Sequence, residues 1–206
     1  MELDSKEASV TKPALFLDRD GTINIDRVYI HDPKLIELIP GAAKSIKKAQ
    51  DAGFAIVVVT NQSGISRGLI DKNALPLINR RVSELLQDEA GASIDLYQIC
   101  PHAPLDRCKC RKPLPKLVLE AANQLGLDLS RSAFIGDKLV DVGCGNRAKC
   151  AASILLRTGK GREEEHILKV GGRQIPAESR PSFVADDLAA AIDWFLASSK
   201  NLSNKA

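Results

Sequence analysis

Two aspartates that could act on phosphorus follow the first apolar run of the chain. Asp18 and Asp20 lie two residues apart, directly after the segment ALFL. A lone pair of this kind could simply form a polar turn, in which aspartates hydrogen-bond to their own backbone. Polar groups in three further segments change this interpretation, because each segment follows a predicted strand. The first contains Thr60, Asn61, Gln62 and Ser63, the second contains Lys112 within CRKP, and the third contains Asp137 and Lys138, followed by Asp141.

This combination of residue types suits phosphoryl transfer. A carboxylate such as Asp18 can attack phosphorus and form an aspartyl-phosphate, which divides one difficult displacement into two easier ones. Asp20 could protonate the leaving oxygen and later activate water. Thr60 and Lys112 would complement the charge of the transferring group. Magnesium binds one or two carboxylates together with phosphate oxygens and water, so the acids also predict a Mg²⁺ site.

A second cluster combines three of the five cysteines with one of the three histidines. Cys100, His102, Cys108 and Cys110 form the pattern C-x-H-x₅-C-x-C. Three thiolates and an imidazole complete a tetrahedral zinc site with no open position, which predicts a structural role. Chance burial of four such side chains is disfavoured, because the loop is dense in Pro, Lys and Arg. Zinc would contribute on the order of 10 kcal/mol to ordering the loop.

The zinc loop also carries two cations. Arg111 follows Cys110 directly and Lys112 comes next, so a bound zinc ion would hold both over the active site. Cys144 and Cys150 lie outside the cluster, and we interpret them as small buried apolar residues.

The elements that must position these groups alternate along the chain. Short apolar runs typical of buried parallel strands cover 14–18, 54–61, 96–100, 133–137, 153–157 and 183–185. Helical periodicity covers 40–53, 115–126 and 187–198, and a less regular helix within 71–90 would start at Pro76. The segments 100–115 and 159–181 read as irregular. The alternation predicts an α/β fold, a doubly wound and mainly parallel sheet with helices on both faces.

We expect a loose extension over residues 1–12, one domain over 13–199 and a polar tail over 200–206. The composition is that of an ordinary globular protein, with 44% hydrophobic and 27% charged residues and a net charge of +3. No apolar run approaches the ~20 residues that span a bilayer, and the first residues lack a secretory signal. We therefore expect a cytoplasmic protein that binds neither membrane nor nucleic acid, and that is monomeric.

The motifs DRDGT, VVVTNQSG, CRKP and GDKLVD resemble the four motifs of the haloacid dehalogenase superfamily of phosphatases. This resemblance implies that Asp18 is the nucleophile and Asp20 the general acid and base. It implies that Thr60 and Lys112 stabilise the phosphoryl group. The implied magnesium ligands are Asp18, the backbone carbonyl of Asp20, and Asp137, with Asp141 as a further candidate that binds through water.

The zinc loop narrows the resemblance, because CPH followed by CxCRKP is similar to the family of heptose 1,7-bisphosphate phosphatases and histidinol-phosphate phosphatases. The segments TNQSGISRG, LLRTGKG and FVADDL resemble the heptose branch. That branch implies a small phosphorylated sugar as substrate, with Arg111 on its second phosphate and no large cap over the site. The implied substrate contacts are Asp26, Arg27, Val28, Tyr29, Thr60, Asn61, Gln62, Ser63, Arg111 and Lys138.

The sequence departs from the heptose branch at Lys116, Gly143, Gly145 and Lys149. Each of the two glycines should weaken the helix that contains it by roughly 1 kcal/mol. Two alternatives stay open. The first is histidinol-phosphate hydrolysis by the same chemistry. The second is a nucleic-acid 3′-end phosphatase or an inactive scaffold. A scaffold should have lost Asp18 or Asp20, and a nucleic-acid enzyme should carry stacking aromatic residues, whereas this chain has one Trp, two Tyr and five Phe.

Overall fold

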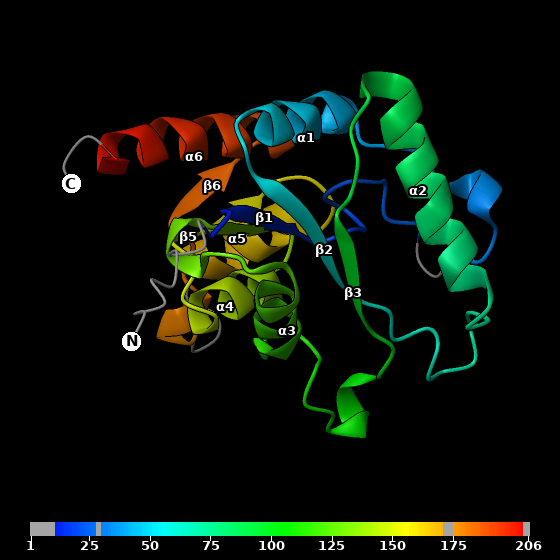
Figure 1. Ribbon diagram of the computed structural model, residues 1–206. Helices are drawn as coiled ribbons and strands as arrows, with labels where there is room; N and C mark the ends of the chain where they lie inside the picture. Colours follow the sequence, from blue (N-terminus) through cyan, green and yellow to red (C-terminus); the bar gives the residue numbers. More distant parts are fainter. Residues whose placement is uncertain (1–10, 28–29, 171–174, 204–206) are drawn as a thin grey trace, which may run out of the picture.

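The computed structural model describes residues 11–27, 30–170 and 175–203. Their strands form one sheet in the order β3-β2-β1-β4-β5-β6, and every neighbouring pair is parallel (Figure 1). This confirms the predicted parallel α/β sheet. The strands are β1 (Ala14–Leu17), β2 (Ala55–Asn61), β3 (Leu96–Cys100), β4 (Ala133–Gly136), β5 (Ala152–Leu156) and β6 (Phe183–Ala185).

Helices cover both faces of the sheet, as Figure 1 shows. They are α1 (Ala42–Asp51), α2 (Ala74–Ala90), α3 (Lys116–Leu125), α4 (Leu139–Arg147), α5 (Gly161–Val170) and α6 (Leu188–Ser203). No large cap is present within the described residues, and none of the described helices is long and apolar enough to cross a membrane.

Alternation along β1 explains the two layers of the core. Leu15 and Leu17 pack with apolar residues of α1, α2 and α6. Phe16 points to the other face and packs with α3, with Phe134 of β4 and with Cys144 of α4. Because successive strand side chains point to opposite faces, an almost wholly apolar strand must be covered on both sides.

Helix α5 corrects the prediction that residues 159–181 are irregular. Glu163 and Glu164 lie in its first turn, where negative charge stabilises the positive end of the helix dipole. Ile167 and Leu168 pack against buried Leu155 of β5. Two apolar residues give too weak a helical periodicity to predict the helix from the sequence.

Two helix boundaries also differ from the expectation. Helix α2 begins at Ala74 rather than at Pro76. Proline is tolerated there, because the first amides of a helix have no intrahelical acceptor to lose. Helix α6 continues to Ser203, so the first residues of the expected polar tail are helical. Residues 1–10 of the expected extension lie outside the described residues.

The glycines of α4 have a packing role that the sequence did not reveal. A Cβ added at Gly145 would lie 2.4 Å from Ser153 Oγ and 2.5 Å from Phe134 Cβ. One at Gly143 would lie 3.1 Å from Pro113 Cβ. These distances show that glycine lets α4 approach the sheet and the loop that carries Lys112.

Candidate active site

The carboxyl ends of three neighbouring strands bring the predicted catalytic groups together. Asp18 follows β1, Thr60 lies near the end of β2, and Asp137 follows β4. The backbone amide of Asp18 donates to the carbonyl of Ile135 in β4, at 3.0 Å, which ties the two strand ends. Ligands of open α/β sheets bind at this edge, where connections leave in opposite directions.

Lys112 lies between two of the acids. Its Nζ is 2.9 Å from Asp18 Oδ1 and 2.7 Å from Asp141 Oδ1, and it donates to the backbone carbonyl of Val59 at 2.6 Å. Lys112 is only 3% exposed. Burial alone would lower its pKa, but the carboxylates of Asp141 and Asp18 raise the pKa above the ordinary lysine value. The ammonium group is therefore charged and fixed before any substrate binds.

Three buried carboxylates form a candidate metal centre. Ligand oxygens of Asp18, Asp137 and Asp141 all lie within 4.8 Å of one another. Burial raises the pKa of Asp137 to about 7, and the neighbouring Asp18 carboxylate adds to the rise. Burial likewise raises the pKa of Asp141, although the charge of Lys112 opposes it. A divalent cation would relieve this repulsion, and oxygen ligands of this kind suit Mg²⁺.

A turn before α5, formed by residues 158–160, encloses Asp137. The sequence did not indicate that this turn belongs to the site. The backbone amide of Lys160 donates to Asp137 Oδ2 at 2.8 Å. Thr158 Oγ1 donates to the carbonyl of Gly21 at 2.6 Å. A Cβ at Gly21 or Gly159 would lie 2.3 Å or 2.2 Å from Asp137 Oδ2. Both glycines have positive φ, of 84° and 50°, so these positions favour glycine for conformation as well as for space.

Asp20 is held by three side chains. Arg19 pairs with both of its oxygens, Asn24 donates to Oδ1, and Gln62 donates to Oδ2. Burial would raise the pKa of Asp20, but the Arg19 charge and these hydrogen bonds hold it below its usual value. Asp20 is thus ionised in this state. No pattern in the sequence singles out Arg19 or Asn24.

A pocket of about 290 Å³ opens over these groups. Among its lining residues are all the described positions for which the sequence implied catalysis or substrate contact, which are Asp18, Asp20, Asp26, Arg27, Thr60, Asn61, Gln62, Ser63, Arg111, Lys112 and Lys138. Val28 and Tyr29 lie outside the described residues. The structure therefore brings together residues from β1, β2, β4 and the loop after β3.

Two of the implied substrate contacts also organise the site. Asn61 exchanges hydrogen bonds with the backbone of Lys112, at 3.1 Å and 3.3 Å. Gln62 Nε2 donates to Thr60 Oγ1 as well as to Asp20. Two further lining residues make ion pairs: Lys138 Nζ is 3.1 Å from Asp137 Oδ1, and Arg27 pairs with exposed Glu37 at 2.7 Å.

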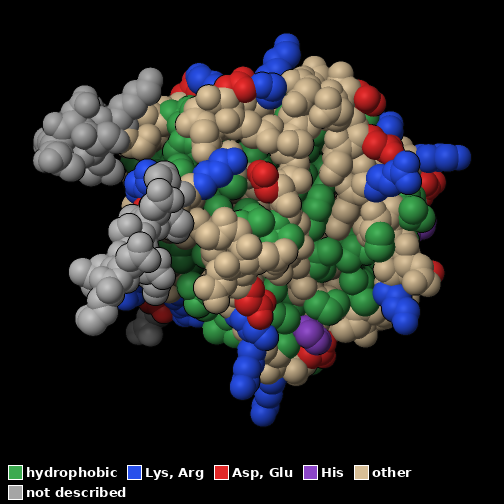
Figure 2. Space-filling view, in the orientation of Figure 1, with side chains coloured by type: hydrophobic (Ala, Val, Ile, Leu, Met, Phe, Trp, Pro, Cys, Tyr) green, Lys and Arg blue, Asp and Glu red, His purple; other side chains and the backbone are tan. Residues whose placement is uncertain are grey.

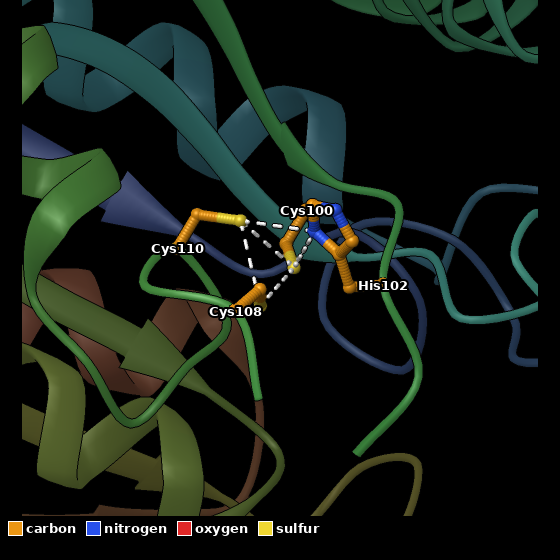
Figure 3. Close-up of side chains that lie close together, drawn as sticks. All are labelled: Cys100, His102, Cys108 and Cys110. Atoms are coloured by element: carbon orange, nitrogen blue, oxygen red, sulfur yellow. Dashed lines mark hydrogen bonds between the residues drawn. The ribbon is translucent and has the colours of Figure 1, made fainter. Parts of the chain in front are cut away.

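The four predicted zinc ligands point toward one another, as Figure 3 shows. The Sγ atoms of Cys100, Cys108 and Cys110 are 3.2–3.6 Å apart, and His102 Nδ1 is 3.3 Å from the Cys110 sulfur. Burial raises the pKa of the Cys100 thiol to about 12, and its two thiol neighbours contribute. Four such groups at these separations match the tetrahedral N and S set of a zinc site.

The cluster is physically connected to the pocket. Arg111 Nη1 donates to the backbone carbonyl of His102 at 3.0 Å, so a residue of the cluster orients the Arg111 side chain. Lys112 follows in the chain. Outside the cluster, Cys144 is fully buried and Cys150 is partly buried against the same core, where burial raises the pKa of each thiol to about 12.

The chain is similar to known proteins in sequence. A model of haloacid dehalogenase-like hydrolases matches residues 11–149, and a HAD-hydrolase-like model matches 109–191. The D-glycero-D-manno-heptose-1,7-bisphosphate 7-phosphatase of Thermosynechococcus vestitus is 36% identical over 193 residues, which are 89% of this chain and 95% of that protein. The corresponding D-glycero-beta-D-manno enzyme of Mesorhizobium japonicum is 46% identical over 152 residues, 70% of this chain and 69% of that protein.

A solved structure agrees with these sequence relatives. The crystal structure of D,D-heptose 1,7-bisphosphate phosphatase from B. bronchiseptica, complexed with magnesium and phosphate, matches with a TM-score of 0.77 and 33% identity. The match covers 90% of this chain and 99% of that one. The chain therefore belongs to the haloacid dehalogenase-like hydrolases, in the branch that contains the heptose bisphosphate phosphatases.

Proposed function

We propose that this protein is a magnesium-dependent phosphatase that removes the 7-phosphate of D-glycero-D-manno-heptose 1,7-bisphosphate through an aspartyl-phosphate on Asp18. The observation that carries the proposal is the ion pair of Lys112 with Asp18 in a pocket that Arg111 also lines. One cation then lies beside the reacting phosphoryl group, and a second is available for the phosphate that does not react. Relatives with this name match most of the chain.

Asp18 is positioned for attack before the substrate arrives. Its backbone amide is tied to β4 and its Oδ1 to Lys112, so the carboxylate has little freedom to rotate. Preorganisation of this kind removes part of the entropic cost of the displacement. Lys112 and Thr60, which are both almost completely buried, complement the charge of the transferring phosphoryl group.

Magnesium fits the three-carboxylate centre, with Asp18, the backbone carbonyl of Asp20, and Asp137 as proposed ligands. Bound Mg²⁺ would screen the negative charge between carboxylate and phosphate. Asp141 accepts an ion pair from Lys112 through Oδ1 and a hydrogen bond from the Lys138 amide through Oδ2. Asp141 therefore orients the Lys112 side chain and the backbone of Lys138, and it would contact the metal only through water.

Asp20 supplies the proton steps. In the first half-reaction it protonates the leaving sugar oxygen, and in the second it accepts a proton from the water that attacks the aspartyl-phosphate. Its ionised state in the free protein suits the second step directly. An approaching phosphate dianion favours the protonated form that the first step requires.

The zinc loop selects the substrate. We propose that Cys100, His102, Cys108 and Cys110 bind one structural zinc ion and that Arg111, held by the His102 carbonyl, binds the second phosphate. Bidentate recognition of phosphate favours arginine over lysine. Metal analysis should find one zinc per chain, and a folded protein without zinc would contradict this assignment. Cys108→Ser should lower kcat/KM for a bisphosphate, with Cys150→Ser as the matched control outside the cluster.

Histidinol-phosphate hydrolysis is the second candidate, because the same catalytic groups would serve it. A nucleic-acid substrate is less well supported. On the face drawn in Figure 2, Lys and Arg side chains are scattered among Asp and Glu side chains instead of forming one basic patch. A monomeric state and a cytoplasmic location remain predictions from the sequence.

A substrate panel tests the proposal. We expect kcat/KM for one anomer of D-glycero-D-manno-heptose 1,7-bisphosphate to exceed that for histidinol phosphate and for a 3′-phosphorylated oligonucleotide by at least about 10²-fold, since the second phosphate adds a charge-assisted contact. Preference for histidinol phosphate would overturn the heptose assignment and leave the catalytic mechanism standing. Comparison of kcat/KM for the two anomers shows which configuration at carbon 1 the pocket accepts.

A further inference from the structure

Arg19 is a buried charge that lies between the two catalytic carboxylates in the sequence. Its side chain is only 1% exposed. Removing a guanidinium group from water costs several kcal/mol unless it is paired and hydrogen-bonded. The partners of Arg19 therefore indicate what this costly charge does.

The guanidinium group connects Asp20 to helix α2. Its Nε donates to Asp20 Oδ1 at 3.2 Å and its Nη2 to Asp20 Oδ2 at 2.9 Å, which is a bidentate pair. Its Nη1 donates to Oδ1 of Asn79, a buried residue of α2, at 2.9 Å. Two donors of the guanidinium group thus hold the Asp20 carboxylate, and the third, Nη1, is bonded to helix α2.

Asn79 is itself fixed by its surroundings. The hydroxyl of Tyr97 in β3 donates to the backbone carbonyl of Asn79 at 3.0 Å. The same hydroxyl is 2.9 Å from Ser83 Oγ, one turn further along α2. The anchor of Arg19 is therefore tied to the edge strand of the sheet.

Arg19 differs from the other groups that contact Asp20. Asn24 reaches only Oδ1, at 2.9 Å, and Gln62 reaches only Oδ2, at 2.8 Å. The guanidinium group contacts both oxygens, so it defines the plane of the carboxylate. Lysine could not replace Arg19, because a single ammonium nitrogen cannot donate to both Asp20 oxygens in one plane and also to Asn79.

We propose that Arg19 is a positioning residue that sets the orientation of the Asp20 carboxyl for proton transfer, and that Asn79 fixes Arg19 from helix α2. The inference rests on the proposed function, in which the P–O bond breaks, its electron pair stays on the leaving oxygen, and that oxygen takes the proton of Asp20. Helix α2 contributes no residue to the pocket lining among the described residues. It nevertheless controls the proton-transfer step through Asn79.

The test compares leaving groups that do and do not need a proton. With the magnesium-loaded protein, the single-turnover rate of Asp18 phosphorylation is measured for phenyl phosphate and for p-nitrophenyl phosphate. Asn79→Ala should slow phenyl phosphate about 10- to 100-fold, because small misplacement of a catalytic group has effects of this size. It should slow p-nitrophenyl phosphate less than about 3-fold, because p-nitrophenolate leaves without protonation. Arg19→Lys should change the rates in the same direction.

Two controls separate the possible results. Arg80→Ala removes an exposed ion pair with Glu84 from the same helix without touching Arg19, Asn79 or Tyr97, and it should leave both rates unchanged. Asp20→Asn should show the full selective loss with phenyl phosphate, and Asn79→Ala in that background should add nothing. Equal losses on both phosphates, or no loss in folded Asn79→Ala, would overturn the positioning role. An Asp20→Asn variant without selectivity would instead overturn the acid–base assignment within the proposed function.

Discussion

Nζ of Lys112 lies 2.9 Å from Oδ1 of Asp18, and both side chains are almost completely buried. The two residues come from distant parts of the chain, one after the first strand and the other after the Cys/His cluster. The pair gives the proposed nucleophile a fixed direction and a neighbouring positive charge in the absence of substrate. We therefore expect the fold to depend on a residue that the proposed chemistry requires.

Replacing Lys112 tests that dependence. Lys112→Met leaves Asp18 and Asp141 buried without their cation, so we expect the free energy of unfolding to fall by about 3–5 kcal/mol, together with loss of turnover. Urea unfolding measures the change, and Lys116→Met, an exposed lysine in α3, is the matched control. A loss below about 1 kcal/mol would show that the pair is not needed for stability.

Magnesium should stabilise the protein more at pH 8 than at pH 6. The pKa of Asp137 is raised from 3.8 to about 7, so the folded metal-free protein holds a proton that the unfolded chain has released. The stability of the metal-free protein therefore falls as the pH rises from about 4 to about 7. Below pH 7, Mg²⁺ must displace this proton, which weakens its affinity by up to about tenfold per pH unit.

Thermal unfolding at a fixed Mg²⁺ concentration measures this effect. The rise in Tm on adding Mg²⁺ should grow between pH 6 and pH 8. In Asp137→Asn it should be small at both values, because the amide cannot supply the charge. An equal rise at both pH values in the unaltered protein would contradict the assignment of Asp137 as a ligand.

Arg111 should distinguish bisphosphates from monophosphates. Arg111→Ala is expected to lower kcat/KM for heptose 1,7-bisphosphate by about 10²-fold, since a charge-assisted hydrogen bond contributes about 1.5–3 kcal/mol. Activity on p-nitrophenyl phosphate should change little. Lys109→Ala, an exposed cation of the same loop, is the control. Equal losses on both substrates would remove the reason for placing the second phosphate at Arg111.

Gly145 offers a stability test that opposes helix propensity. Alanine normally favours a helix interior over glycine by about 1 kcal/mol. In α4 an added Cβ would meet Ser153 and Phe134, so Gly145→Ala should instead destabilise the protein by about 1–3 kcal/mol. Gly143→Ala should cost less, because its nearest neighbour is 3.1 Å away. A gain in unfolding free energy for Gly145→Ala would show that α4 can shift away from the sheet.

The strands were predictable because each is a short apolar run, and a parallel sheet buries such runs on both faces. Helix α5 was not predictable in this way, since its sequence GREEEHILKV contains few apolar residues, of which Ile167 and Leu168 pack against Leu155. The close approach of Gly145 to Phe134 was also hidden. Its cause is a contact between elements, which no local pattern contains.

That the proposed catalytic residues lie together was predictable for a related reason. Asp18, Thr60, Lys112 and Asp137 each follow or end a strand, and parallel strands bring their carboxyl ends to one edge. The residues that orient this set were not predictable. Asn79 lies within a helix of ordinary composition, and its contact with Arg19 depends on how α2 packs against the sheet.

Identification of the product tests directly whether Asp18 accepts the 7-phosphate. The magnesium-loaded protein is incubated with D-glycero-D-manno-heptose 1,7-bisphosphate, and the products are identified by phosphorus NMR. We expect heptose 1-phosphate and inorganic phosphate, with no turnover by a folded Asp18→Asn variant. Release of the 1-phosphate, or appreciable turnover by Asp18→Asn, would contradict it.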